Sequence, residues 1–280
     1  MITTPIALLV LFSALMHASW NYLIKTSPDR LLDTVGLAVG GSLLSACLLP
    51  FVPLPAPASL PWLGVTIIIH VGYFLTLIEA YRHTDLSIAY PLMRGLAPML
   101  VALAAPLTGV PLTFGLLIGV VLIASGIMLP VGMSIRHSTI ANAGLWFACG
   151  NAIIIAIYTI VDGIGVRLSG SVISYTLWLF FLDAWGILAI AWWQRGNTVM
   201  GHLRRRWKPA LVGAVLTIGA YGIVLWAMSV ASIPAVAALR ESSVVIAAIL
   251  GTLLLKERMG RWRIAGAILV ASGAASIRWG

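Results

Sequence analysis

Residues 232–263 read SIPAVAALRESSVVIAAILGTLLLKERMGRWR, and this stretch decides how the rest of the chain is interpreted. Its first part is an apolar run long enough to cross a bilayer, because about 20 helical residues span the hydrocarbon core. Arg240 and Glu241 lie inside that run, where each charge costs about 2.5–3.5 kcal/mol on insertion scales. A charge at such a depth is tolerated where it is paired, hydrated or used. We therefore expect this pair to have a partner elsewhere in the chain.

The composition is that of an integral membrane protein. Of the 280 residues 61% are hydrophobic and 9% are charged, with a mean hydropathy of +1.05, whereas a soluble domain carries about 25% charged residues. The formal net charge of +9 comes from basic residues in short gaps between apolar runs. That is the positive-inside pattern and not a nucleic-acid face, so we expect no nucleic-acid partner. Cys47 and Cys149 fall within apolar runs and are expected to be buried hydrophobes, so we expect no metal and no cofactor.

The hydropathy predicts an all-α membrane protein with ten transmembrane helices. The gaps carry turn residues and none is long enough for a soluble domain, which predicts one compact membrane domain. The ten predicted spans are 3–24, 31–52, 61–81, 86–107, 111–131, 140–161, 171–193, 209–230, 233–255 and 262–279.

An internal repeat relates the two halves of the chain. A shift of about 147 residues places LIASG at 122–126 on LVASG at 269–273, and the earlier spans need a shift about ten residues smaller. Each half contains five spans, and an odd number predicts that the two copies enter the membrane in opposite orientations. We therefore expect a first five-helix repeat over 1–137 and a second, inverted repeat over 138–280.

The basic residues give a separate indication of this inversion. Nearly all of them fall in gaps on one predicted face, and only Arg167 and Arg278 fall on the other. The positive-inside rule then makes the first face cytoplasmic, with both termini outside, in a bacterial inner membrane. The residues on the basic face are Lys25, Arg30, Arg82, Arg136, Arg195, Arg204, Arg205, Arg206, Lys208, Lys256, Arg258, Arg261 and Arg263.

The span that the repeat relates to 233–255 also carries a deep arginine. It reads AYPLMRGLAPMLVALAAP over 89–106. The shift places Arg94 opposite Glu241, and a slip of one residue places it opposite Arg240. Pro91 and Pro98 withhold backbone donors and predict an interrupted helix, which in inverted repeats indicates a transporter binding site. The alternative is an ion pair between Arg94 and Glu241 that only holds two spans together.

Two guanidinium groups suit bidentate binding of a carboxylate, phosphate or phosphonate. On a continuous helix Arg240 and Glu241 project about 100° apart and are not expected to face the same neighbour. Glu241 is then free for an ammonium group or a coupling proton. The predicted substrate-binding residues are Arg94, Arg240, Glu241, Ser243, Tyr90, Trp20 and Asn21.

Proton coupling needs an ionisable group inside the membrane. Asp183 lies in the middle of a span and suits a proton carrier. The alternative is a neutral Asp183 that is hydrogen-bonded to a neighbouring span. His70 is expected to be a satisfied core residue, and Glu79 and Asp162 fall near predicted span ends and are not expected to act. The predicted proton-coupling candidates are Glu241, Asp183 and His17.

With these motifs, the chain resembles the drug/metabolite transporter superfamily, in particular its ten-span EamA-type members, over nearly its whole length. The resemblance is strongest around 79–128 and 227–276 and in HASWNYLIK at 17–25. MRGLAP at 93–98 and LRESS at 239–243 resemble a branch linked to phosphonate use. The resemblance implies export or exchange of small metabolites from a central cavity. The first span has no glutamate, which departs from the small four-span cation exporters of the superfamily and argues against their proton-for-cation antiport.

The sequence therefore predicts a secondary transporter, an exporter or exchanger, of a small metabolite with an anionic group. The transporter would use alternating access around a midplane cavity. Its expected partners are this small molecule and the lipid bilayer, and the expected state is a monomer or homodimer. The alternative within transport is a flippase of an amphipathic or lipid-linked head group. An enzyme is not expected because HExxH and GxSxG are both absent. A passive structural subunit, with the arginines only paired, is the third possibility.

Overall fold

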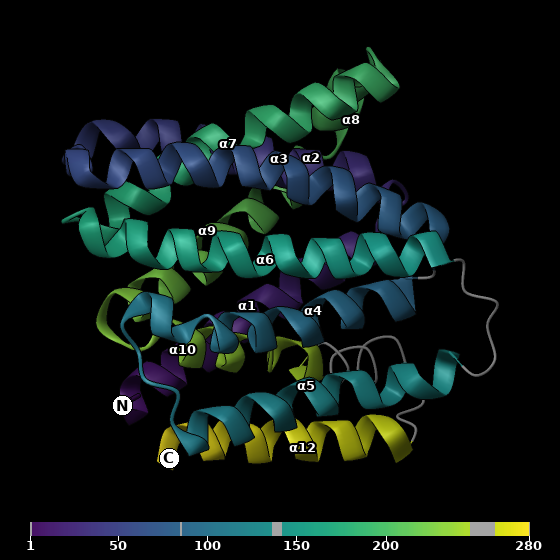
Figure 1. Cartoon of the computed structure of the whole chain (residues 1–280). Helices are drawn as coiled ribbons and strands as arrows, with labels where there is room; N and C mark the ends of the chain where they lie inside the picture. The colour runs from purple at the N-terminus through teal and green to yellow at the C-terminus, as the bar shows by residue number, and fades with distance from the viewer. Residues whose placement is uncertain (1, 85, 136–141, 247–260, 280) are drawn as a thin grey trace.

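The computed structural model describes residues 2–84, 86–135, 142–246 and 261–279, and these residues are helical without any β-strand. The helices run lengthwise across the view of Figure 1 in stacked layers, with α2, α3 and α7 at one edge and α5 and α12 at the other. The first half contains α1 Thr4–Lys25, α2 Arg30–Leu48, α3 Leu60–His83, α4 Leu86–Leu103 and α5 Phe114–Ile135, with short 3₁₀ turns η1 Leu49–Phe51, η2 Pro57–Ser59 and η3 Ala105–Thr108. The second half contains α6 Asn142–Leu168, α7 Val172–Arg195, α8 Thr198–Arg205, α9 Trp207–Val230, α10 Ile233–Arg240 and α12 Arg261–Trp279.

Six helices in the described ranges are long and apolar enough to cross a membrane. Many of their large apolar side chains, such as Phe12, Ile68 and Trp146, are exposed on the outside of the bundle, where lipid would cover them. Helices satisfy their own backbone groups, which hydrocarbon requires. The chain is therefore a multi-pass membrane protein. The six spans are Thr4–Ile24, Arg30–Phe51, Pro57–His83, Ala143–Leu168, Val172–Arg195 and Trp207–Val230, and shorter apolar helices cover Ile88–Leu103, Phe114–Leu129 and Ile264–Ile277.

Four features of the helices and their residues differ from the sequence-based expectation. α6 continues to Leu168 instead of ending at 161, and α10 ends at Arg240 instead of continuing. α4 runs on through Pro91 and Pro98, so these prolines do not end it. Cys47 is exposed on α2 and not buried, because this part of α2 faces outward.

Some expectations concern parts of the chain outside the described residues. These are the boundary between the two predicted repeats at 137/138, the end of the span predicted over 233–255, and the basic residues Arg136, Lys256 and Arg258.

α5 and α12 pack closely and antiparallel through glycines. A Cβ atom added at Gly126 would lie 2.5 Å from the carbonyl oxygen of Gly266, and one added at Gly273 would lie 2.5 Å from that of Gly119. No side chain larger than hydrogen fits at such distances without a backbone shift. The contacts pair increasing residue numbers on α5 with decreasing numbers on α12, so the two helices run in opposite directions.

Buried polar side chains join other pairs of helices. Ser13 on α1 donates from Oγ to the carbonyl oxygen of Ala220 on α9 at 2.7 Å. Asn151 on α6 donates from Nδ2 to the carbonyl oxygen of Tyr73 on α3 at 2.9 Å and to Oγ1 of Thr76 at 2.8 Å. Such side-chain bonds to backbone oxygen fix the rotation of one helix against the next.

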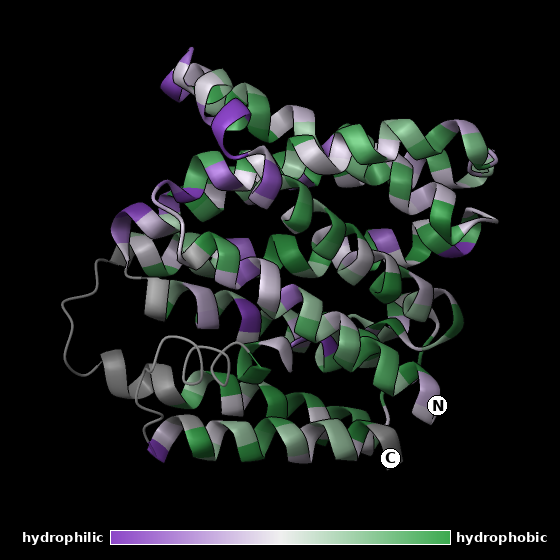
Figure 2. Ribbon diagram, turned by 180° about the vertical axis from the view of Figure 1, so that it is seen from behind, coloured by the Kyte–Doolittle hydropathy of each residue, from purple (hydrophilic) through white to green (hydrophobic). Residues whose placement is uncertain are grey.

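The two ends of the bundle differ in charge. The N- and C-termini lie at one end, and α8 with its basic last turn lies toward the other (Figure 1). Figure 2 shows that hydrophobic residues dominate along the helices, with hydrophilic ones gathered around α8 and in patches within the bundle. This agrees with a membrane crossed along the helix axes.

Candidate functional site

Arg94, Arg240 and Glu241 lie together inside the bundle, and we call them the arginine cluster. Nε of Arg94 on α4 lies 2.8 Å from Oε2 of Glu241, and Nε of Arg240 at the end of α10 lies 3.4 Å from Oε1. The side chains are 7%, 5% and 1% exposed for Arg94, Arg240 and Glu241. One buried carboxylate therefore lies between two buried guanidinium groups.

The end of α10 explains how adjacent residues join one cluster. The N–H of Glu241 donates to the carbonyl of Ala238, and that of Ser242 donates to Leu239, so the chain tightens into a turn after Arg240. The separation of about 100° between neighbouring side chains applies to a continuous helix. The prediction that Arg240 and Glu241 point apart is therefore wrong, because the helix ends between them and the two side chains touch.

The arginine cluster has unused hydrogen-bonding capacity. Among the residues described, Nη2 of Arg94 and Oγ of Ser243 are buried and make no hydrogen bond. Nε of Arg94 and Oε2 of Glu241 lie 2.8 Å apart and form an ion pair. The N–H of Arg94 does not point at this oxygen, so the contact is not a hydrogen bond. Two guanidinium groups and one carboxylate leave one positive charge in excess. Such an arrangement favours an additional anion, because buried donors without partners are costly.

Of the predicted residues of α1, His17 lies near this cluster. His17 is close enough to Arg94 and Arg240 to interact electrostatically with both. Its ring contacts that of Trp20 edge-on, with centroids 4.9 Å apart, and Nε1 of Trp20 is buried without a hydrogen-bond partner in the described structure. Asn21 differs, because its Nδ2 donates to the carbonyl oxygen of His17 at 2.8 Å and so binds its own helix.

Tyr90 on α4 is half-buried one turn before Arg94. It interacts electrostatically with both Arg94 and Glu241. The structure thus brings Tyr90 and His17 within electrostatic range of the arginine cluster, and Trp20 contacts His17.

Asp183 on α7 pairs with His70, which was expected to be a satisfied core residue. Its Oδ1 lies 3.2 Å from Nδ1 of His70 on α3, and the two side chains are 20% and 10% exposed. Asp183 therefore contacts a neighbouring span, and this contact fits both the proton carrier and the hydrogen-bonded neutral residue considered for it. His70 has this partner because α3 and α7 pack against each other, which hydropathy alone does not reveal.

Asp162 was expected near a span end, and this expectation is wrong. α6 extends to Leu168, so Asp162 lies within it and is fully buried. Tyr175 on α7 donates its hydroxyl to Oδ1 at 3.1 Å, and Tyr221 on α9 donates to Oδ2 at 2.5 Å. The boundary error arose because Arg167 was taken as a loop residue. Its guanidinium instead donates to the carbonyl oxygens of Met228 and Ala231 at 2.9 and 2.7 Å.

A second ionic group, the Asp33 cluster, joins α2 to the basic segment around α8. Oδ1 of Asp33 lies 2.6 Å from Nε2 of His202, and Oδ2 accepts a hydrogen bond from Nη2 of Arg206 at 2.6 Å. That hydrogen bond raises the pKa of Arg206, which stays charged. The sequence signal was an acidic residue in the first turn of a span whose start lies on the basic face.

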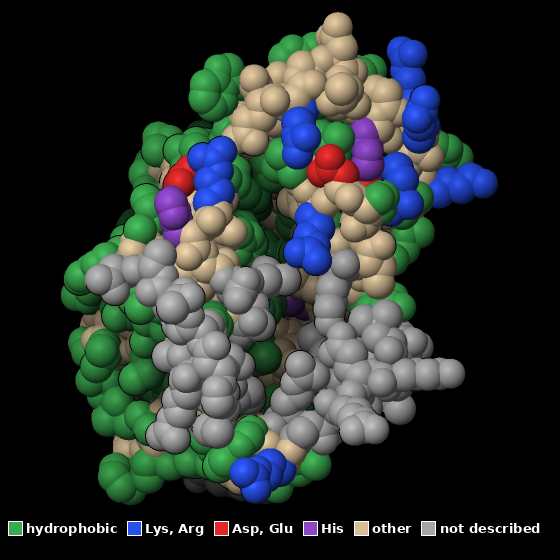
Figure 3. All heavy atoms as spheres, turned by 90° about the vertical axis from the view of Figure 1, so that its right-hand side faces the viewer, with side chains coloured by type: hydrophobic (Ala, Val, Ile, Leu, Met, Phe, Trp, Pro, Cys, Tyr) green, Lys and Arg blue, Asp and Glu red, His purple; other side chains and the backbone are tan. Residues whose placement is uncertain are grey.

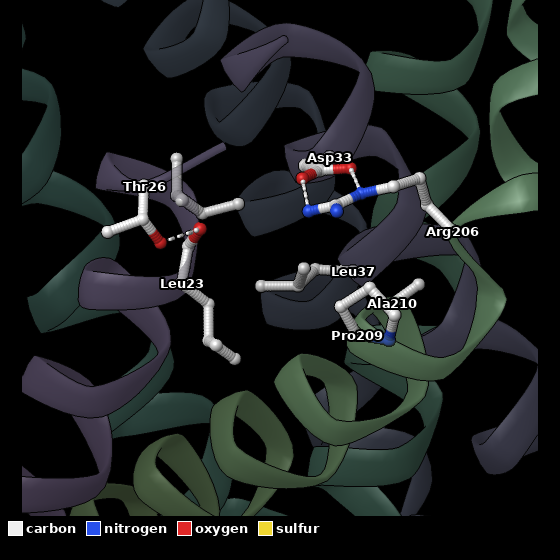
Figure 4. Close-up of a pocket in the computed structure, with 8 residues that line it drawn as sticks. Leu23, Thr26, Asp33, Leu37, Arg206, Pro209 and Ala210 are labelled. Carbon is white, nitrogen blue, oxygen red and sulfur yellow. Dashed lines mark hydrogen bonds and ion pairs between the residues drawn. The ribbon is translucent and has the colours of Figure 1, made fainter. Parts of the chain in front are cut away.

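Next to the Asp33 cluster is a cavity of about 230 Å³. Figure 4 shows Asp33 and Arg206 pointing toward each other at its rim. The cavity is lined by Leu23, Ile24, Thr26, Asp33, Leu37, Arg206, Pro209 and Ala210, and not by the arginine cluster.

The described residues contain no group of three or more His, Cys, Asp or Glu side chains placed to hold a metal ion. At the arginine cluster, the two guanidinium groups are donors suited to binding an anion.

Comparisons with known proteins agree with a transporter. Residues 142–279 match the model of the EamA-like transporter family, so this part of the chain is similar to that family. The members of this family are transporters of small solutes and not enzymes. A solved structure described only as "Crystal structure of protein" has the same fold, with a TM-score of 0.77, 18% identity and 98% of each chain covered. No curated protein matches the chain in sequence.

Proposed function

We propose that the protein is a secondary transporter, an exporter or exchanger, of a small metabolite with an anionic group. The arginine cluster would hold this group and alternating access would expose it to each side in turn. Its partners would be the metabolite and the lipid bilayer, with the chain working as a monomer or homodimer in a bacterial inner membrane. Phosphonate, phosphate and carboxylate are the groups that two guanidiniums recognise best.

The excess positive charge of the arginine cluster carries this proposal. A purely structural ion pair needs one cation for one carboxylate, yet here Glu241 has two guanidinium partners. Nη2 of Arg94 and Oγ of Ser243 remain without hydrogen bonds. Removing a charge from water costs several kcal/mol per ion. If the second arginine served only to pack the helices, an apolar residue would do so without this cost.

An inverted repeat of five helices in each half supports alternating access. Under the shift of about 147 residues, Gly119 and Gly126 correspond to Gly266 and Gly273. The shift therefore maps the contact between Gly126 and Gly266 onto the contact between Gly273 and Gly119. In both contacts, a Cβ atom added to the first glycine would lie 2.5 Å from the carbonyl oxygen of the second. This exchange is expected from a two-fold relation. The antiparallel course of α5 and α12 supports an inverted and not a parallel repeat.

The hydrogen bonds between helices follow the same relation. Tyr73 corresponds to Ala220 under this shift, and Ser13 corresponds to Asn151 within one residue under the smaller shift of the early spans. The bond from Ser13 to Ala220 and the bond from Asn151 to Tyr73 are therefore equivalents in the two halves. The packing of the helices follows the same relation. The contact of α3 with α6 corresponds to that of α9 with α1, and the contact of α4 with α6 corresponds to that of α10 with α1. This supports ten spans arranged as two repeats.

The arginine cluster is closed to solvent in this conformation, so cargo requires helix movement. Figure 3 shows one end of the bundle, where charged side chains gather and the surface is hollowed between groups of them. Both termini lie at the opposite end (Figure 1). This agrees with a basic cytoplasmic face through which the cluster opens and with termini outside.

Ligand-dependent unfolding of the purified protein tests the proposal. The detergent-solubilised chain would be heated with inorganic phosphate, sulfate, methylphosphonate or small carboxylates. We expect at least one anion to stabilise the parent, by about 2.7 kcal/mol at a hundred times its Kd. Arg240→Ala should abolish this stabilisation. Arg204→Ala, which removes an exposed arginine of α8, is the matched control and should retain it.

Transport follows in proteoliposomes with the stabilising anion. The parent and Arg204→Ala should move it, and replacement of both Arg94 and Arg240 by apolar residues should stop it. Equal stabilisation of the parent and Arg240→Ala, or transport by the double variant, would contradict the proposal and favour a structural role for the two arginines.

A further inference from the structure

A second buried polar group is formed by residues of α3, α6 and α7. Its core is the pair of His70 on α3 and Asp183 on α7, with Nδ1 and Oδ1 3.2 Å apart. Asp162 on α6 lies within electrostatic range of His70. These three residues come from three helices that pack against one another.

The environment of Asp162 fixes it as a hydrogen-bond acceptor. Both of its oxygens accept tyrosine hydroxyls, from Tyr175 and Tyr221, and its exposed fraction is zero. Thr66, one helical turn before His70, is fully buried and lies near Asp162, yet its hydroxyl makes no hydrogen bond of full geometry. The Thr66 hydroxyl thus adds a third polar neighbour to Asp162, besides the two tyrosines.

His70 is the group of this region suited to gaining and losing a proton. The groups that face it from the neighbouring helices set its charge: carboxylates on α6 and α7, tyrosines on its own helix and on α6, and, further away, Tyr90 and Arg94 on α4. Of these, the Asp183 carboxylate lies 3.2 Å from Nδ1 of His70, and imidazolium beside carboxylate is a stable arrangement. The groups are Asp183, Asp162, Tyr73, Tyr158, Tyr90 and Arg94.

A metal ion is a poorer occupant than a proton. No three His, Cys, Asp or Glu side chains of the described residues converge at metal-binding distance. Asp162 also has both oxygens engaged by tyrosines, so of the three ionisable residues described here His70 and Asp183 remain as ligands. Two ligands are fewer than Na⁺-sized or divalent ions require.

Tyrosines connect this region to the arginine cluster. The ring of Tyr158 on α6 lies 4.7 Å from that of His70, centroid to centroid. Tyr158 and Tyr221 both interact electrostatically with Arg240. Tyr221 is in addition the donor to Asp162. The side chain of Tyr158 therefore links His70 to Arg240, so that a change of charge at His70 can alter the electrostatic potential at Arg240.

We propose that His70 and Asp183 form the proton-binding site that is coupled to anion binding at the arginine cluster. The proton adds to the imidazole ring, which becomes an imidazolium beside the Asp183 carboxylate, and no bond to cargo forms or breaks. This removes net negative charge near Arg240 and Arg94 and thereby strengthens the binding of an anion there. By linkage, a bound anion strengthens proton binding equally. The coupling part of this inference rests on the proposed function.

The proton site can be tested without any cargo. The chain contains five histidines, so ¹⁵N-histidine NMR of the protein in detergent micelles gives few signals, and His70→Gln identifies the one from His70. That signal should titrate between about pH 5 and 8, the range of a histidine switch. Asp183→Asn should displace its midpoint, and Arg240→Ala should displace it by less. Arg204→Ala is the control and should leave it in place.

A His70 signal that does not change over this pH range would overturn the proposal, and so would a midpoint unaffected by Asp183→Asn. If Asp183→Asn does not fold, infrared pH-difference spectra of the parent and His70→Gln replace it. The parent should show a carboxylate band that responds to imidazole protonation, and His70→Gln should lack it. A band unchanged in His70→Gln would overturn the pair.

The two proposals fail separately. Failure of this titration leaves anion stabilisation through Arg240 intact. Loss of anion stabilisation leaves a His70–Asp183 proton site that lacks its coupled cargo, and then Arg240→Ala should still displace the midpoint.

Discussion

Two ionic clusters in this bundle each place one carboxylate between two basic groups. In the arginine cluster Glu241 lies 2.8 Å from Arg94 and 3.4 Å from Arg240, and none of the side chains is more than 7% exposed. In the Asp33 cluster the carboxylate contacts His202 and Arg206, both at 2.6 Å, and these side chains are 15% and 36% exposed. The contacts of the outer cluster are shorter, yet the inner cluster is the more deeply buried.

The difference shows that contact distance is a poor guide to what an ionic cluster does. Near water, an ion pair offsets little more than the entropy of holding its side chains, and its contribution is about 0–1 kcal/mol. In a buried site the same charges have lost their hydration, so each depends on the other. A buried cluster with one unbalanced positive charge is therefore suited to binding an anionic ligand. The outer cluster needs no ligand and can serve only to hold α2 against α8.

Removal of the buried carboxylate should have the largest effect. Glu241→Gln keeps the size of the side chain but leaves two buried guanidiniums without a countercharge. We expect a loss of about 3–5 kcal/mol in the free energy of unfolding, because an uncompensated buried charge costs that much. Thermal and denaturant unfolding in detergent would measure it.

An anion that binds the arginine cluster should restore part of the stability lost in Glu241→Gln, since it supplies the missing charge. Glu79→Gln is the matched control, because Glu79 is partly exposed and pairs with Arg82 near the end of α3. A Glu241→Gln protein as stable as the control, with no response to phosphate or sulfate, would mean that the cluster is neither buried nor charged as described.

The same change in the outer cluster should have a smaller effect. Asp33→Asn removes the contacts of His202 and Arg206 but leaves both near water. We expect about 1 kcal/mol of destabilisation and no loss of anion-induced stabilisation. The unfolding measurement is the same. A cost equal to that of Glu241→Gln would show that the α2–α8 contact is as buried as the inner cluster.

The sequence contained much of the fold but less of the candidate site. Apolar runs of about 20 residues and the repeat indicated where helices lie, because hydropathy and length suffice for that. The repeat also placed Arg94 opposite Glu241, and the structure brings these residues into contact. Hydropathy does not encode the rotation of one helix against another, so the His70–Asp183 contact and the two tyrosines on Asp162 were not predictable. The helix end after Arg240 was also missed, since nothing in ALRESS marks a stop.

The smallest of the expected effects is a difference between the two clusters in how ionic strength changes the cost of removing the carboxylate. Raising the ionic strength from about 0.05 M to about 0.5 M shortens the Debye length from about 14 Å to about 4 Å, which screens exposed charges and leaves buried ones almost untouched. The cost of Asp33→Asn should therefore shrink by a few tenths of a kcal/mol, while that of Glu241→Gln stays constant. The experiment compares unfolding of the parent and both variants at the two ionic strengths in chloride salt. Arg204→Ala controls for a general effect of salt on the micelle. A salt-dependent cost for Glu241→Gln would place water at the arginine cluster, and the contrast between a dry inner cluster and a hydrated outer one would be lost.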